Sequence, residues 1–124
     1  MHMNNIYDTY WIVEYCIEVY LQANGKAPFS EWALALDKSM RSRVNARVAR
    51  FENGHFGDHK ALGDGIFEAR IFIGPGYRVY FAIHDRRVVL LLCAGDKSTQ
   101  DKDVAKAKEF FKSYLEVQNA NKKS

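Results

Sequence analysis

The chain has 124 residues, 48% of them hydrophobic and 14% aromatic, which is enough for one compact core and excludes a disordered chain. Its net charge of only +3 excludes a highly charged nucleic-acid coat protein, but the charge is unevenly distributed. Residues 1–40 hold two Lys or Arg against five Asp or Glu, residues 41–87 hold nine against five, and residues 88–124 hold seven against five. The basic middle and end of the chain therefore favour a polyanionic partner.

We expect a single domain over residues 1–124, with a core from about 11 to 118 and a polar tail over residues 119–124 that frays. Cys16 and Cys93 are expected to be buried free thiols of a reducing compartment, because both lie in apolar, strand-like runs. Two cysteines do not make a zinc site, so no metal or other cofactor is expected. Without a secretory signal or an apolar run of roughly 18 residues, the chain is predicted to be cytoplasmic and not to enter a membrane.

The first predicted element is a half-buried strand over residues 12–21, where apolar and polar side chains alternate with period two. A turn at residues 24–28 ends this strand. Apolar residues then recur near the helical period, and Ser30 is a good N-cap. We therefore expect a short helix over about 30–37 and a longer one over about 39–52, packed as a hairpin.

Asn53-Gly54 predicts the end of the second helix, and residues 54–65 contain four glycines and are predicted to form a loop. This loop carries His55, His59 and Lys60. The two histidines are four residues apart, but metal ligation is not expected from them because the segment is not helical. His59 is a candidate for proton transfer, and the alternative is an ordinary solvated loop residue.

The second half of the chain predicts three consecutive strands, at about 66–73, 77–84 and 88–94, joined by short turns into an antiparallel meander. The last of them is continuously apolar, which indicates a central strand buried on both faces. Residues 101–118 form the last predicted helix. The predicted fold is α+β in the order β-α-α-β-β-β-α, a single antiparallel-rich sheet with a helical hairpin on one face and a C-terminal helix nearby.

Four cations lie at the ends of these strands: Lys60, Arg70, Arg78 and Lys97. The turn between Arg70 and Arg78 is short, so the two side chains are expected to face one groove, and each guanidinium matches a phosphate bidentately. RNA is the polyanion that we expect such a sheet to bind. The alternative is that the four residues are solvated charges at strand ends.

Further candidates for RNA binding are Arg43, Arg47 and Arg50, which share one face of the second predicted helix. Tyr80 points to the same face of its strand as Arg78, and an exposed ring there would stack on a base. The alternative for Tyr80, and for Tyr77 nearby, is a place in the core.

The residues before the last helix allow two compatible interpretations. Ser98 or Thr99 caps the helix, and the same helix end, together with Lys97, binds a phosphate. Asp96 lies beside them and is a candidate for acid–base chemistry.

Four segments together resemble a known family: GKAPFSEWALALD, RSRVNARVARFENGHFGDHKALGDGIFEARI, GPGYRVYF and VVLLLCAGDKSTQDKDVAKAK. They cover about residues 25–108 and resemble the RelE/ParE toxin superfamily, most closely its HigB-like "addiction module killer protein" branch. The resemblance implies the toxin of a type II toxin–antitoxin operon and the β-α-α-β-β-β-α fold. It also implies a small antitoxin partner, often with a helix-turn-helix, and binding of operator DNA only as the toxin–antitoxin complex.

Many members of this superfamily cleave mRNA on the ribosome without a metal, by attack of a ribose 2′-OH on the adjacent phosphate, whereas the ParE branch inhibits DNA gyrase. By resemblance, Arg78 matches the phosphate-stabilising arginine, and Arg70, Lys97 and Lys60 match or lie near other basic positions of the cleft. The proton donor departs from the family pattern, and Asp96, Asp103, Glu68 and His59 are the possible substitutes. The alternatives to an mRNA endonuclease are a gyrase inhibitor and a degenerate member that only binds antitoxin or DNA.

Overall fold

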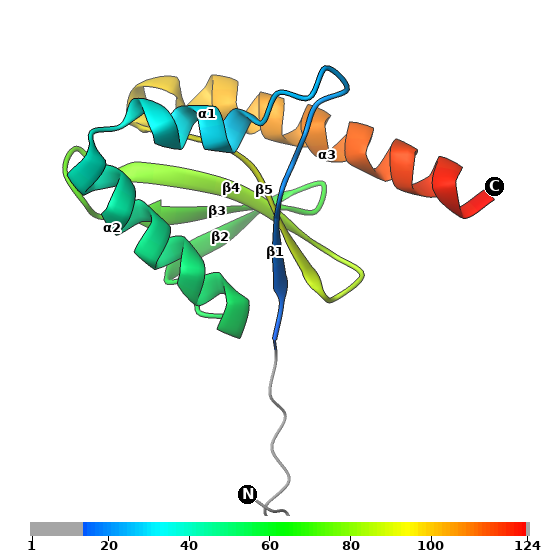
Figure 1. The fold of residues 1–124 in the computed structure, drawn as a ribbon, viewed down its shortest axis with the longest axis horizontal. Helices are drawn as coiled ribbons and strands as arrows, with labels where there is room; N and C mark the ends of the chain where they lie inside the picture. Colours follow the sequence, from blue (N-terminus) through cyan, green and yellow to red (C-terminus); the bar gives the residue numbers. More distant parts are fainter. Residues whose placement is uncertain (1–13, 124) are drawn as a thin grey trace, which may run out of the picture.

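The computed structural model describes residues 14–123, so the predicted strand residues before Glu14 lie outside the described part of the chain. Five strands and three α-helices form an α+β fold, traced in Figure 1. The elements are β1 (Cys16–Val19), α1 (Pro28–Ala35), α2 (Lys38–Ala49), the short 3-10 helix η2 (Arg50–Asn53), β2 (Asp58–Gly63), β3 (Ile66–Ile71), β4 (Tyr77–His84), β5 (Val88–Gly95), the 3-10 helix η3 (Lys97–Thr99) and α3 (Gln100–Lys123).

The predicted loop over residues 54–65 is wrong in its second half, because β2 occupies Asp58–Gly63 and pairs antiparallel with β3. Three consecutive residues of left-handed backbone, Gly63, Asp64 and Gly65, make the tight turn between the two strands. The element order after the helices is therefore four strands and not three. β2 escapes recognition because it is a polar, exposed edge strand without an apolar alternation.

The helix boundaries also differ from the prediction. α1 begins at Pro28, before the predicted cap Ser30, because proline at the first helical turn needs no N–H partner. Asp37 caps α2 by accepting a hydrogen bond from the Met40 backbone N–H at 3.0 Å. The tail that was predicted to fray is helical up to Lys123.

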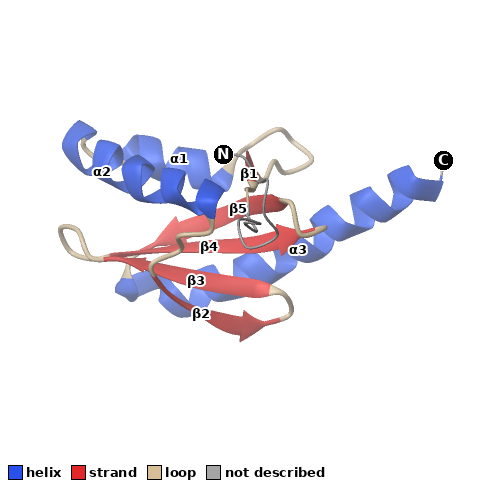
Figure 2. Cartoon of the chain, turned by 90° about the horizontal axis from the view of Figure 1, so that it is seen from below, coloured by secondary structure: helices blue, strands red, loops and turns tan. Residues whose placement is uncertain are grey.

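The sheet has the strand order β1-β5-β4-β3-β2, with β1 parallel to β5 and every other pair antiparallel. β5 therefore lies between β1 and β4 and is buried from Val89 to Gly95, as its continuous apolar run predicts. α1 and α2 cover one face of the sheet and α3 crosses the other, as Figure 2 shows. The predicted helical hairpin on one face is confirmed.

Two apolar cores result, one on each face of the sheet. The core below α1 and α2 includes Phe29, Val44, Val48, Phe51, Val79, Phe81 and Leu91. The core below α3 includes Ile66, Tyr80, Leu90, Leu92, Ala107 and Phe111. Alternation along each strand thus fixes which side chains face α3 and which face α2, and this decides where the cationic residues point.

Candidate functional site

Arg70 and Arg78 lie directly opposite each other on β3 and β4. Arg70 lies four positions after Ile66 and Arg78 two positions before Tyr80, so each arginine shares a face of its strand with a residue of the core below α3. Both arginines therefore point to the α3 face of the sheet. Their side chains keep 38% and 17% of their surface exposed, respectively. The two guanidinium groups thus lie side by side on one face, partly open to solvent, as the short turn between the strands predicts.

A buried carboxylate lies between the two arginines. The Glu68 side chain is completely buried, and its two oxygens lie 3.8 Å from Arg70 Nε and 3.8 Å from Arg78 Nε. Gln100, the first residue of α3, donates a hydrogen bond from Nε2 to Glu68 Oε2 at 2.9 Å. Glu68 therefore shares its single charge between both guanidinium groups, Asp58 adds a second carboxylate 3.9 Å from Arg70 Nε, and the start of α3 holds Glu68 in place.

Three buried polar atoms of this cluster have no hydrogen-bond partner among residues 14–123: Glu68 Oε1, Arg78 Nε and the Tyr80 hydroxyl. The contacts of Glu68 with the arginines are therefore charge contacts without short hydrogen bonds. Such atoms are uncommon in protein interiors.

Tyr80 is completely buried, so the alternative of a place in the core is confirmed and its ring is not exposed for stacking on a base. Tyr77 is buried as well, on the opposite face. Burial raises the pKa of the Tyr80 hydroxyl, and the negative charge of Glu68 beside it raises the pKa further. Tyr80 therefore stays protonated. It is a buried neighbour of Glu68 and the arginine pair.

Asp96 and Lys97 follow β5 directly, and the last residue of that strand, Gly95, is paired with Arg78. Asp96 accepts hydrogen bonds from the hydroxyl and the backbone N–H of Ser98, and thereby caps η3. These bonds lower the pKa of the Asp96 carboxyl, to which the charge of Arg78 adds. Asp96 is therefore an ionised proton acceptor close to Arg78, and Lys97 is exposed beside it.

Lys60 and His59, both candidates for the catalytic site, are neighbours on β2 and therefore point to opposite faces of the sheet. Lys60 is paired with Glu68 and so points to the face of the arginine pair, where it is exposed. His59 is paired with Ala69 and points to the opposite face, next to Phe56. The structure therefore does not bring His59, one of the possible substitutes for the proton donor, together with Arg78, because the segment is a strand whose side chains alternate.

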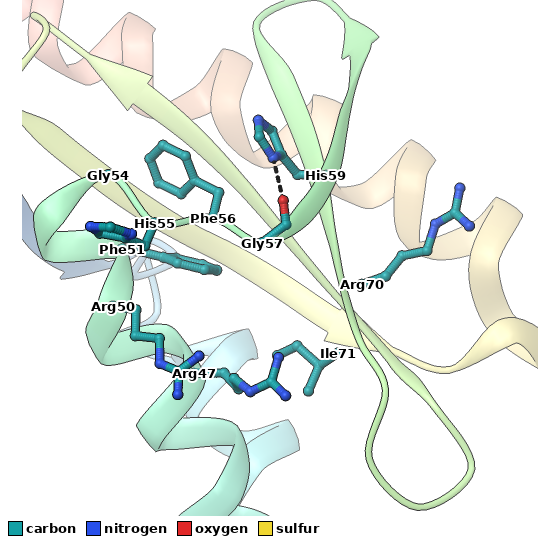
Figure 3. Close-up of a pocket in the computed structure, with 10 residues that line it drawn as sticks. All are labelled: Arg47, Arg50, Phe51, Gly54, His55, Phe56, Gly57, His59, Arg70 and Ile71. Carbon is teal, nitrogen blue, oxygen red and sulfur yellow. Dashed lines mark hydrogen bonds between the residues drawn. The ribbon is translucent and has the colours of Figure 1, made fainter.

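His59 instead borders a hollow of about 660 Å³ on the α2 face of the sheet, drawn in Figure 3. Its lining residues are Arg47, Arg50, Phe51, Gly54, His55, Phe56, Gly57, His59, Arg70 and Ile71. Of the three arginines predicted to share one helix face, Arg47 and Arg50 line this hollow and Arg43 does not. Arg70 lines it at one end with its guanidinium pointing away from Arg47 and Arg50 (Figure 3).

From the sequence, Glu68 was named only as a possible proton donor. Its position between the two arginines was not predicted, and Gln100 was not named. The available signal for Glu68 is a lone acid in the apolar strand Ile66–Ile71, two positions before Arg70. An acid at an inward-facing strand position needs a buried cation, and the opposite strand offers Arg78.

No group of three or more His, Cys, Asp or Glu residues that could hold a metal ion is present in the described part of the chain. None of its helices is both long and apolar enough to cross a membrane.

Comparison with known proteins relates more than half of the chain to one family. Residues 31–112 match the family model described as "Phage derived protein Gp49-like (DUF891)". A protein of Haemophilus influenzae, named only as an uncharacterized protein, is 48% identical over 90 residues, which cover 71% of this chain and 90% of that protein. The matched residues span α2, η2, all strands from β2 to β5 and most of α3, and so include both the arginine pair and the hollow. The chain therefore belongs to the phage-derived Gp49-like family, a RelE/ParE-like family associated with toxin–antitoxin systems.

Proposed function

We propose that this protein is the HigB-like toxin of a type II toxin–antitoxin system and that it cleaves mRNA on the ribosome. The observation that carries the proposal is the cross-strand pair of Arg70 and Arg78, fixed by a buried carboxylate and partly open to solvent. Two adjacent guanidinium groups on a rigid sheet suit a phosphate that gains charge during a reaction.

In the proposed reaction, the 2′-oxygen of a ribose attacks the adjacent phosphorus, and the bond from phosphorus to the 5′-oxygen breaks. Arg78 and Arg70 bind the non-bridging phosphate oxygens, on which negative charge accumulates in the transition state. Asp96, which its lowered pKa keeps ionised, accepts the proton of the 2′-OH as a weak base, so the arginine pair supplies most of the transition-state stabilisation. The 5′-oxygen takes its proton from water, and the products are a 2′,3′-cyclic phosphate and a 5′-OH.

Exposed Lys60 and Lys97 lie on either side of the arginine pair in the sheet order, on β2 and after β5. In the proposal, the two lysines bind the phosphates of neighbouring nucleotides and so hold the RNA in register with the arginine pair. The cytoplasm, where ribosomes and mRNA meet, is the proposed location. The proposed partner is a cognate helix-turn-helix antitoxin, and the complex of the two would bind operator DNA.

Substitution of Arg78 by alanine tests the proposal. Arg78→Ala is expected to abolish growth arrest on induction and to slow cleavage of translated mRNA by roughly a hundred- to thousandfold, equivalent to about 2.7–4 kcal/mol. Arg87→Ala is the matched control, because Arg87 is exposed at the opposite end of the β4–β5 hairpin. If Arg78→Ala remains as toxic as Arg87→Ala at equal protein levels, the arginine pair is not the active centre.

A further inference from the structure

The hollow on the α2 face is strongly cationic. Its lining includes Arg47, Arg50, His55, His59 and the end of β3 at Arg70, but no Asp or Glu. Arg47 and Arg50 are three residues apart and therefore neighbours on the surface of the helical segment. Within residues 14–123, neither of these two arginines forms an ion pair, so both guanidinium groups have all their donors available to a ligand.

Aromatic rings form another part of the lining. Phe56 stacks on Phe81 with a centroid distance of 4.9 Å, and its ring centroid lies 5.2 Å from that of Phe51. These two contacts with core residues hold the ring of Phe56 in place. The ring of His59 meets Phe56 edge-on at 5.5 Å. In Figure 3 the rings of Phe56 and His59 lie across the hollow from Arg47. A rigid aromatic surface facing guanidinium groups is the combination that binds single-stranded nucleic acid.

The orientation of the His59 imidazole is set by the backbone. Nδ1 lies 2.8 Å from the carbonyl oxygen of Gly57, and because a carbonyl only accepts hydrogen bonds, Nδ1 carries the hydrogen. Gly57 has a φ of +66°, a conformation that presents this carbonyl to the ring and that other residues rarely adopt. The remaining nitrogen, Nε2, is left available to a base or a ribose hydroxyl.

The hollow and the arginine pair meet at one residue. Arg70 lines the hollow and also lies opposite Arg78 on the other face of the sheet. β2 begins at Asp58, which is paired with Arg70, so β2 does not cover the edge of β3 beyond that position. The end of β3 at Arg70 is therefore the place where the two sites adjoin, and we infer that a single nucleic-acid strand bound in the hollow continues past it to Arg78.

We propose that the hollow is a nucleotide subsite for the same single-stranded RNA that is cleaved at Arg78. Arg47 and Arg50 bind a phosphate, and the base of that nucleotide stacks on Phe56 beside His59. This inference rests on the proposed function for the identity of the ligand, but apart from Arg70 the hollow is built from residues outside the proposed catalytic set.

Binding of an uncleavable RNA tests the subsite. The probe is a fluorescein-labelled single-stranded oligonucleotide with every 2′-OH methylated, so that no 2′-oxygen can attack, and affinity is read from fluorescence anisotropy at several salt concentrations. The double variant Arg47→Ala/Arg50→Ala is expected to bind roughly tenfold or more weakly than the wild type. The slope of log affinity against log salt is expected to fall by about 0.7, for the one lost phosphate contact.

The control is Lys38→Ala/Arg87→Ala, which removes two exposed cations elsewhere and is expected to change affinity far less. Circular dichroism checks that both double variants are folded. Equal losses in the two double variants, or no measurable binding of the probe by the wild type, would overturn the subsite. An otherwise identical probe without bases is expected to bind at least about fivefold more weakly, and equal binding would also overturn the subsite as a nucleotide site.

The same variants separate this inference from the proposed function. If the wild type cleaves mRNA and Arg47→Ala/Arg50→Ala binds and cleaves like the wild type, the subsite is wrong and the proposed function stands. If no RNA is cleaved but the double variant specifically loses affinity for the probe, the subsite stands and the nuclease proposal is wrong.

Discussion

Glu68 decides how the cationic residues are arranged. A carboxylate with no exposed surface is costly to bury, and here two guanidinium groups and the amide of Gln100 compensate it. The sequence shows the acid and both arginines, but it does not show that Glu68 and Arg78 come into contact across two strands. That contact depends on the register of β3 and β4, in which Glu68 is paired with Tyr80 and Arg70 with Arg78.

Replacement of Glu68 by glutamine tests this arrangement. Glu68→Gln keeps the shape of the side chain but leaves Arg70 and Arg78 without their shared counter-charge. We expect the free energy of unfolding to fall by up to about 3 kcal/mol, the lower part of the range for a broken buried pair, because both arginines keep some contact with solvent. Urea unfolding measures the change, with exposed Glu109→Gln as the control. Equal stability of the two variants would mean that Glu68 does not position the pair.

The two cysteines differ in solvent exposure, contrary to the prediction that both are buried. Cys93 is buried below α3, whereas Cys16 is exposed on the edge strand β1. Burial, together with the negative charge of Asp103, raises the pKa of the Cys93 thiol from an ordinary value of 9.0 to about 12. The alternation of β1 did not reveal this, because the short edge strand leaves one face of the sheet uncovered at Cys16.

Thiol titration at pH 8 is expected to detect one reactive cysteine in the native protein and two after denaturation, with Cys16→Ser removing the native signal. Because the folded pKa of Cys93 exceeds the unfolded value, its contribution to stability is complete below pH 9 and is lost as the pH rises towards 12. Rapid reaction of both thiols in the folded protein would contradict the structure.

At the scale of elements, the buried strands β3, β4 and β5 and the helical hairpin were predictable, because apolar periodicity identifies elements that cover a core. β2 was not predictable, because its residues are almost all exposed and an exposed edge strand shows no apolar periodicity. Because the segment was predicted to be a loop, the face of the sheet to which His59 points was not predictable, and neither was the hollow. Element type thus followed from periodicity, whereas the placement of site residues depended on strand pairing.

The junction between β5 and α3 is tightly packed around Gly95. A Cβ atom added at Gly95 would collide with the carboxylate of Asp103 and the hydroxyl of Thr99, which are joined by a hydrogen bond of 2.6 Å. Gly95→Ala is therefore expected to lower the free energy of unfolding by about 1–3 kcal/mol.

The same change is expected to displace Asp96 and Lys97 from Arg78, so RNA cleavage should fall as well. Asp103→Ala, which removes the main obstacle, serves as the background control in a double-mutant cycle of thermal unfolding. A cost of Gly95→Ala that is unchanged in the Asp103→Ala background would show that the collision is not its cause.

At the scale of the whole molecule, one sheet carries two cationic sites on opposite faces, and Arg70 at the edge belongs to both. The α+β class and the helical hairpin followed from the sequence, and the family match agrees with the resemblance to RelE/ParE toxins. Asp96 was a candidate for acid–base chemistry from the sequence, but its lowered pKa was not predictable, because it depends on hydrogen bonds that only the folded chain makes. Cleavage of RNA at the arginine pair is the central claim.

Mapping of RNA 5′ ends after induction tests that claim most directly. Cells expressing the wild type should acquire new 5′-OH ends within translated codons, and cells expressing equal amounts of Arg78→Ala should lack them. Inhibition of translation before induction should suppress the new ends, because the substrate is mRNA on the ribosome. Growth arrest with altered DNA supercoiling and no new RNA ends would contradict the account and indicate a gyrase inhibitor.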